Sequence, residues 1–143
     1  MFKKIVAFVL ILVFVSVAAL AADKTYGNVI VDRIISVYDG DTFKVDIDSW
    51  PDIIGKHISV RIYGIDTPEM KDKRPHIKVL AKQAKELTKY YLNHAKVVEL
   101  RNIRRGKYFR IVADVYVDGI NLAEVLISKG LAKPYYGGTK EKW

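Results

Sequence analysis

Residues 28–48 read NVIVDRIISVYDGDTFKVDID, and this stretch predicts how the fold begins. Its first half is rich in β-branched residues, which favour strands. Its second half alternates apolar and charged residues, so that Phe43 and Val45 share one face, as in a strand with one buried side. The Asp39-Gly40 pair between the halves is typical of a tight hairpin turn. The stretch therefore predicts a β-hairpin that packs one face against a core.

Three further segments have the alternation or the β-branched content of strands. They are HISVRIYG (57–64), KVVELRNI (96–103) and RIVADVYV (110–117). Between the first and the second, residues 78–96 carry apolar side chains at steps of three and four, which indicates a helix of about four to five turns with one apolar stripe. The stripe is expected to comprise Leu80, Ala84, Leu87 and Tyr91.

A second, shorter helix is expected near the end of the chain. Asn121 followed by Glu124 resembles a capping box, and Gly130 closes the helix. The predicted element order is β-β-β-α-β-β-α, which is the order of an OB-fold. The predicted fold class is therefore α+β, mainly β, with a five-stranded OB-fold barrel and two helices. Side chains fill the interior of so small a barrel, so ligands bind on its outer surface or in its loops.

The N-terminus, MFKKIVAFVLILVFVSVAALAA, has the pattern of an export signal. A short basic start precedes an unbroken apolar run, and small residues end it in an A-x-A cleavage pattern. We expect residues 1–21 to be a signal peptide and residues 22–143 to form one mature domain, secreted or periplasmic. The alternative is an uncleaved membrane anchor, since the run from Ile5 to Ala22 is just long enough to cross a bilayer.

Composition narrows the classes of partner. The chain has 24 Lys and Arg against 16 Asp and Glu, a net charge of +8, which becomes +6 without the two lysines of the signal segment. A basic exported domain favours a polyanionic partner such as nucleic acid, phospholipid headgroups or a wall polymer, although solubility explains the charge alone equally well. The absence of cysteine excludes disulfides, thiolate metal sites and a cysteine nucleophile.

Charged residues gather in three clusters at the ends of the predicted strands. The clusters are Asp39 and Asp41 in YDGDT, then Arg61, Asp66, Thr67 and Glu69 in RIYGIDTPE, then Arg110 in KYFR. Taken singly, the acidic residues are explained by turn chemistry, because Asp, Gly and Pro are common in turns. As a set, they offer oxygen ligands for a hard cation, arginines for phosphate oxygens and a carboxylate that can deprotonate water. Phosphodiester hydrolysis requires these same groups.

Simpler motifs do not account for the clusters. DGDTF begins like an EF-hand loop, but Phe43 stands at its fifth position and the required glycine is missing. The histidines His57, His76 and His94 have no ligand spacing, so no zinc site is expected. The sequence also contains no Gly-rich phosphate loop.

Four stretches together resemble the staphylococcal-nuclease (thermonuclease) family. They are DGDT (39–42), RIYGIDTPE (61–69), KYFR (107–110) and the ending NLxxxLxxxGLA (121–132). The likeness runs from about Val29 to Tyr136, nearly the whole of the expected mature chain. It implies an OB-fold and a nuclease that depends on one Ca²⁺ ion, acts on DNA and RNA and leaves 3′-phosphate ends.

The resemblance also implies a role for each matching charged residue. Asp41 and Asp66 match the family's calcium-binding carboxylates, to which Thr67 adds a backbone carbonyl. The catalytic groups follow in a separate set: Arg61 matches the arginine that grips the scissile phosphate, Glu69 the general base, and Arg110 the arginine that stabilises the transition state.

The remaining matches concern nucleotide contacts. Tyr108 and the Tyr135–Tyr136 pair fall where the family has tyrosines that contact nucleotide, and Lys107 is expected to join them. One departure affects this region, because Phe109 stands where the family usually has glycine. If that position has a positive φ, Phe109 is strained there and can displace the neighbouring arginine.

Two other classes of function remain open from the residues alone. The first is a non-catalytic OB-fold module that holds single strands, using the basic residues 71–74 and 101–107 and the exposed tyrosines. The second is a cell-surface protein that binds anionic wall polymers, which explains the charge but not the paired acids. The nuclease is the preferred interpretation, and no interface pattern points to an oligomer, so a monomer is expected.

Overall fold

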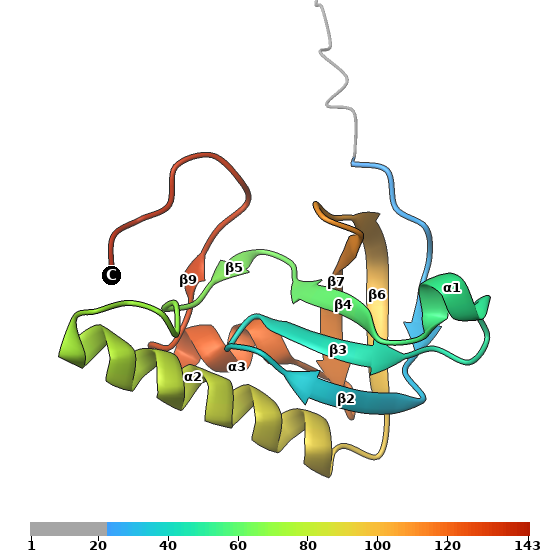
Figure 1. The fold of residues 1–143 in the computed structure, drawn as a ribbon, viewed down its shortest axis with the longest axis horizontal. Helices are drawn as coiled ribbons and strands as arrows, with labels where there is room; N and C mark the ends of the chain where they lie inside the picture. The colour runs from blue at the N-terminus through green and yellow to red at the C-terminus, as the bar shows by residue number, and fades with distance from the viewer. Residues whose placement is uncertain (1–22) are drawn as a thin grey trace, which may run out of the picture.

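A computed structural model describes residues 23–143, and Figure 1 shows the arrangement of its elements. The predicted signal peptide, residues 1–21, lies outside the described residues. The elements are β1 (Val29–Ile30), β2 (Arg33–Val37), β3 (Thr42–Asp46), α1 (Asp52–Gly55), β4 (Ile58–Ile62), β5 (Ile65–Asp66), α2 (Pro75–His94), β6 (Val98–Arg105), β7 (Arg110–Val117), β8 (Ile120–Asn121), α3 (Leu122–Ser128) and β9 (Lys133–Pro134).

The main sheet has seven strands and curls into a barrel-like shape. Its order is β1-β6-β7-β4-β3-β2, with β8 paired to β7, and only the β4–β7 pair is parallel. The segment that contains β1 and β2 joins the two edges of the sheet. At the crossing, Val31 N–H donates to the Val98 carbonyl, and Asp32 N–H donates to the Asp46 carbonyl. The predicted order of five long strands and the OB-type fold are confirmed.

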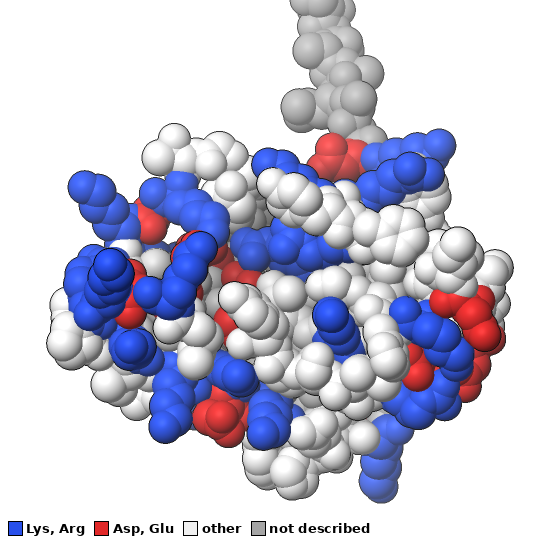
Figure 2. Space-filling view, viewed as in Figure 1, with Lys and Arg blue, Asp and Glu red and all other residues white. Residues whose placement is uncertain are grey.

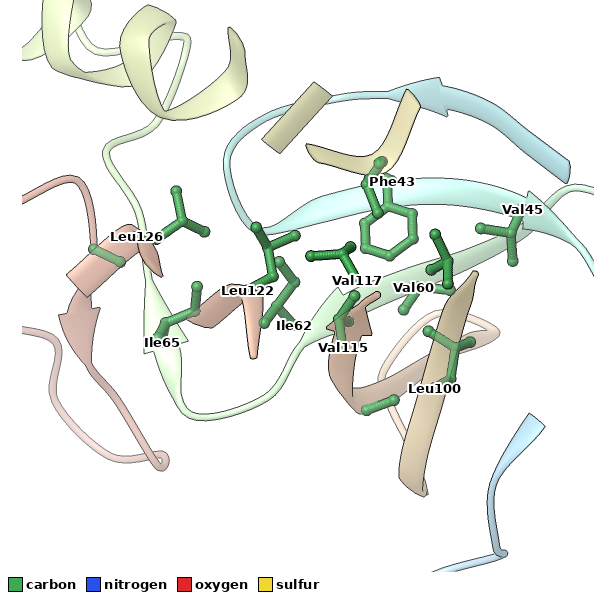
Figure 3. Close-up of a cluster of buried hydrophobic side chains, with 14 of the residues drawn as sticks. Phe43, Val45, Val60, Ile62, Ile65, Leu100, Val115, Val117, Leu122 and Leu126 are labelled. Atoms are coloured by element: carbon green, nitrogen blue, oxygen red, sulfur yellow. The ribbon is translucent and has the colours of Figure 1, made fainter. Parts of the chain in front are cut away.

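The interior is filled by the inward-facing residues that the alternation predicts. Phe43 and Val45 from β3, Val60 from β4 and Leu100 from β6 are completely buried, and Figure 3 shows them packed together. Their outward neighbours are left on the surface of the sheet. The strands therefore place polar and charged side chains outside the barrel, as expected for a barrel too small to hold a ligand.

Helix α2 covers one end of the barrel, and its buried face differs from the predicted stripe. The buried residues are Ile77, Ala81, Ala84, Thr88 and Leu92, whereas three of the four predicted stripe residues are only partly buried at its flank. The reason is size, because Ala81 and Ala84 let the helix backbone approach the barrel more closely than larger side chains would.

The C-terminal helix follows the prediction more closely. The Asn121 side chain accepts a hydrogen bond from Ala123 N–H at 3.0 Å, and Gly130, at φ +69°, follows the helix end. One additional helical turn, α1, forms between β3 and β4, where no helix was predicted, and β5 pairs with β9 in a separate two-stranded sheet. Within residues 23–143, none of the helices has the length and apolar character needed to cross a bilayer.

Candidate active site

Three turns and the C-terminal segment converge on one pocket of about 660 Å³. The turn between β2 and β3, the segment from β5 to α2, the β6–β7 hairpin and the residues after β9 all contribute to its walls. Eight of the ten residues predicted for the site line it: Asp41, Arg61, Asp66, Thr67, Glu69, Lys107, Arg110 and Tyr135. Tyr108 and Tyr136 are not among the lining residues.

The pocket combines acids at its centre with an excess of cations. Its four carboxylates belong to Asp39, Asp41, Asp66 and Glu69, and its six cationic side chains to Arg61, Lys71, Arg105, Lys107, Arg110 and Lys140. Figure 2 shows the corresponding face, on which acidic side chains lie in the middle and Lys and Arg side chains border them. Such an arrangement attracts an anion while leaving room for a cation at the acids.

A glycine lets the turns come this close together. A Cβ atom at Gly40 would lie 2.7 Å from the Ala84 Cβ and 2.9 Å from the Thr67 Cγ2. These distances are too short for carbon atoms, so any larger residue would have to push its neighbours away. The Thr88 hydroxyl donates to the Gly40 carbonyl at 2.7 Å and ties the turn to α2. The helix thus fixes the turn that carries Asp41 against the turn that carries Thr67.

Asp41 is buried at the centre of these contacts. It is only 3% exposed, and its Oδ2 accepts a hydrogen bond from Thr67 N–H at 3.1 Å. Its Oδ1 accepts from the Thr42 hydroxyl at 2.9 Å and lies 3.0 Å from Arg61 Nη1. The two predicted carboxylate turns are therefore joined directly, by the hydrogen bond from the Thr67 main-chain N–H to the Asp41 carboxylate.

Asp66 is also buried, and the C-terminal segment covers it. Lys140 Nζ lies 2.6 Å from its Oδ1, and Trp143 Nε1–H donates to its Oδ2 at 3.3 Å. Arg61 Nη2 lies farther away, 3.7 Å from Oδ1. Further contacts hold this segment, because Arg74 donates to the Trp143 carbonyl at 2.7 Å.

Asp39, a member of the first predicted cluster that was assigned no role of its own, is a third carboxylate at the acidic centre. Its Oδ1 accepts from Asp41 N–H at 3.1 Å. Burial, and then the negative charge of Asp41, raise the pKa of Asp39 to about 7. The shift reflects a poorly solvated carboxyl group that lies next to a second carboxylate.

The residues present fit a hard divalent cation. Two buried carboxylates from different turns supply oxygen ligands. The Lys140 ammonium already occupies the position of a cation next to one of them, Asp66. Thr67 Oγ1 is buried without a hydrogen-bond partner at the same place. Among residues 23–143 no group of three or more His, Cys, Asp or Glu side chains is arranged to hold a metal, so a cation here would rely on two carboxylates with main-chain or water oxygens.

The two arginines enter the pocket from adjacent strands. Ser59 of β4 pairs with Arg110 of β7, so Arg61 and Arg110 lie two residues apart in register on the same outer face of the sheet. Arg61 is held by its contact with Asp41 and by a hydrogen bond to the Ile65 carbonyl at 3.1 Å. Arg110 Nε is buried and has no hydrogen-bond partner among the described residues.

Glu69 lies at the rim, outside the buried acidic centre. Its side chain is 54% exposed, and its one ion pair is with Lys71 at 3.5 Å. Pro68, fully buried, fixes φ between Glu69 and Thr67. The main chain at Glu69 is therefore held in place by Pro68, whereas its carboxylate is open to water and to a bound substrate.

The hairpin that carries Arg110 has a strained tip. Tyr108 and Phe109 both have φ of 57°, the sign required at the two central positions of a type I′ turn and unfavourable for bulky residues. The strain expected at Phe109 is thus present. The displacement of Arg110 does not follow, because Arg110 stays in register with Ser59 and lines the pocket.

The three tyrosines occupy different surroundings. Tyr135 lines the pocket and donates to the Gly138 carbonyl at 3.1 Å. Tyr136 contacts Tyr63 edge to face, with ring centroids 5.6 Å apart, and is largely exposed beside the pocket. Tyr108 is 92% exposed at the hairpin tip. Only Tyr135 is placed to contact a group at the acidic centre.

Sequence reasoning missed Lys140, Trp143 and Arg105 as parts of the site. Arg105 and Lys107 lie in the predicted basic segment, so their charge was a usable signal. The contact of Lys140 with Asp66 joins residues 74 positions apart and follows no local pattern. Only the folded chain brings these groups together.

The fold and the pocket define a class: an OB-type barrel whose outer face carries buried carboxylates, two arginines and a rim glutamate. Comparison with known proteins agrees, since the staphylococcal nuclease homologue family model matches residues 59–142. The chain therefore belongs to the staphylococcal nuclease family.

Individual relatives extend the match over most of this chain. It is 38% identical over 115 residues to Endonuclease YncB of Bacillus subtilis, covering 79% of this chain and 50% of that protein. It is 32% identical over 114 residues to the Thermonuclease of Staphylococcus hyicus, covering 79% of this chain and 60% of that protein. The chain thus spans about half the length, or somewhat more, of these curated relatives.

Proposed function

We propose that this protein is a calcium-dependent nuclease that hydrolyses phosphodiester bonds in DNA and RNA and leaves 3′-phosphate ends. The observation that carries the proposal is the meeting of Arg61 and Arg110, from adjacent strands, with buried Asp41 and Asp66 in one pocket. Family membership, and relatives named endonuclease and thermonuclease, support it.

In this proposal the two arginines bind the phosphate that is cleaved. Planar guanidinium groups can donate to two phosphate oxygens at once and stabilise the negative charge that grows as water attacks. Tyr135 and Lys107, at the wall of the pocket, would contact the neighbouring nucleotide.

Glu69 is proposed as the general base. It accepts a proton from the attacking water as the new P–O bond forms, and the bond from phosphorus to the 5′ oxygen breaks. The departing 5′ oxygen takes a proton from solvent water, which leaves a 3′-phosphate and a 5′-hydroxyl. Its exposed carboxylate at the pocket rim supports this role, because water reaches it without a conformational change.

Asp41 and Asp66 are the residues proposed to hold the cation, with the Thr67 carbonyl as a further ligand. A bound Ca²⁺ would supply positive charge that neutralises the phosphate. Two buried carboxylates in a hollow bordered by cations are the feature that supports this assignment.

The test is digestion of plasmid and heat-denatured DNA, and of RNA, with Ca²⁺ and with a chelator. Degradation in calcium and none in the chelator is expected, with 3′-phosphate ends detected by their removal with a phosphatase. A gel shift without cleavage in both conditions would overturn the proposal in favour of the non-catalytic binding module.

We also propose that the enzyme is exported and acts as a monomer. The support for export is the signal-like segment, residues 1–21. N-terminal sequencing of the protein recovered outside the cytoplasm is expected to begin at Ala22, and intact residues 1–21 would indicate an anchor instead.

A further inference from the structure

A second hollow of about 650 Å³ lies next to the pocket and has no role in the reaction described so far. The β2–β3 hairpin, β4, α2 and the loop after Glu69 form its walls. Four residues line both hollows: Tyr38, Thr42, Met70 and Lys71. The second hollow is therefore continuous with the candidate active site and has the size of a ligand pocket.

The charge of this hollow has one sign. Lys44, Lys71 and Lys85 line it, and no acidic residue does. Among residues 23–143, neither Lys44 nor Lys85 has a carboxylate within ion-pair distance. Lysines that neutralise no acid of the protein attract a polyanion, and they contribute most where several phosphates follow one another.

Strand register connects these lysines to the arginines. Ser36, Lys44, Ser59 and Arg110 are consecutive partners across β2, β3, β4 and β7, so they form one row on the outer face of the sheet. Neighbouring strands are about 4.8 Å apart, which places the Lys44 and Arg110 backbones about 10 Å apart. The serines between and beside them are small and leave the row open as a shallow trough.

An aromatic side chain stands where the two hollows join. Tyr38 follows β2 directly, is 67% exposed and lines both hollows. An exposed tyrosine in a basic groove is a platform on which an unpaired base can stack. Met70, on the other lining segment, offers an adaptable apolar contact at the same junction.

We propose that this hollow, which we call the lysine groove (Lys44, Lys71, Lys85 and Tyr38), is a second nucleic-acid subsite. It binds a single-stranded segment that continues from the cleaved phosphate. Lys44 and Lys85 contact its backbone phosphates, and a base stacks on Tyr38. That the bound strand continues from the cleaved phosphate rests on the proposed nuclease function. Binding of a single strand in the groove does not require cleavage.

The test compares substrates that reach the groove with one that does not. Lys44→Gln and Lys85→Gln are expected to raise KM several-fold for a twelve-nucleotide single strand and to leave KM for a dinucleotide unchanged. Lys89→Gln is the matched control, because Lys89 is exposed on the same helix and lines neither hollow. Equal effects on both substrates, or an effect of Lys89→Gln as large as that of Lys85→Gln, would overturn the subsite.

Binding in a chelator separates the subsite from catalysis. The affinity for the fluorescent twelve-mer should fall in the lysine variants, and the negative slope of log affinity against log salt should become shallower by about 0.7 for each lysine removed. Tyr38→Ala should weaken binding of the normal oligonucleotide and not of one with abasic positions. If the protein binds in this pattern but never cleaves, the nuclease proposal fails and the groove stands. If it cleaves and all variants bind alike, the groove fails.

Discussion

Two ionic clusters lie at opposite ends of strand β3, and they treat their carboxylates in opposite ways. After β3, Asp48 receives hydrogen bonds from Arg33 at 3.0 Å and Lys56 at 2.6 Å, and the bond from Arg33 is the first cause that lowers the pKa of Asp48 to about 2. Before β3, burial raises the pKa of Asp39 to about 7 beside Asp41.

The two clusters differ in how their acidic side chains are paired. The cluster around Asp48 pairs each acid with cations and gains stability from the ionised form. The cluster around Asp39 and Asp41 places two acids beside one cation, Arg61, and burial together with the charge of Asp41 still raises the pKa of Asp39. One sheet thus carries a half-exposed ion-pair cluster at one end of β3 and a buried acidic cluster, proposed above as a cation site, at the other.

The largest effect that this contrast predicts concerns Glu69, the one acid at the site that is neither buried nor tightly paired. Glu69→Gln is expected to lower kcat by ~10²–10⁴-fold on a labelled oligonucleotide, because the amide accepts no proton. The melting temperature should not change, since the side chain is half exposed and its partner is Lys71.

The control for this prediction is Glu86→Gln, an exposed glutamate on α2 that should leave kcat unchanged. A Glu69→Gln enzyme within threefold of the wild-type kcat would remove Glu69 from the reaction. Arg61→Ala is a less clean test, because it also leaves the buried Asp41 carboxylate without its cation and is expected to destabilise the fold.

The next effect concerns competition for Asp66. The Lys140 ammonium lies where a cation would bind, so Lys140→Gln is expected to strengthen Ca²⁺ binding about fivefold, the size of a partly exposed ion pair. Calorimetry measures the affinity, and Trp143 fluorescence in a Trp50→Phe background reports release of the segment. Lys142→Gln removes the same charge without a contact to Asp66 and should bind Ca²⁺ nearly as the wild type does.

The third prediction concerns how the stability of the fold depends on pH through the raised pKa of Asp39. Because the folded-state pKa of Asp39 is raised above its ordinary value of about 4, the folded state holds a proton that the unfolded state has released. Stability in chelator should therefore fall as pH rises from 4 to 7. Asp39→Asn keeps the acceptor for Asp41 N–H and removes the charge, so its melting temperature should fall less over that range.

Asp52→Asn, at an exposed acid on α1, should keep the wild-type slope. Parallel curves for Asp39→Asn and wild type would mean that Asp39 titrates normally, and the contrast between the clusters would be lost.

Much of this arrangement could be predicted from the sequence, for a physical reason. Alternation along β3 and β4 decides which side chains leave the barrel, and turn residues decide where strands end, so Asp41, Arg61 and Asp66 could be placed near one another. Contacts that depend on packing could not. The predicted stripe of α2 packs against the core, but the centre of the buried face lies beside it, because small residues set how closely the helix approaches. The Lys140–Asp66 contact depends on where the C-terminal segment folds back.

Strain at the rim of the site gives the fourth prediction. Phe109→Gly should stabilise the fold by about 1 kcal/mol, because glycine adopts the positive φ without the steric cost and the exposed ring contributes little packing. Phe109→Ala is the matched control, since it removes the ring and keeps the strain. Urea unfolding measures both, and equal stabilities for the two variants would show that the tip is unstrained.

The smallest effect belongs to the cluster on the other side of β3. Its sign is opposite to that of Asp39: the folded-state pKa of Asp48 is lowered, so its contribution is present above pH 4 and is lost as pH falls toward 2. Asp48→Asn should therefore lower the urea midpoint slightly at pH 7, change it less at pH 3, and leave kcat unchanged. A variant that lost activity while keeping its midpoint would place Asp48 in the function of the site, and the two ends of β3 would then no longer differ in kind.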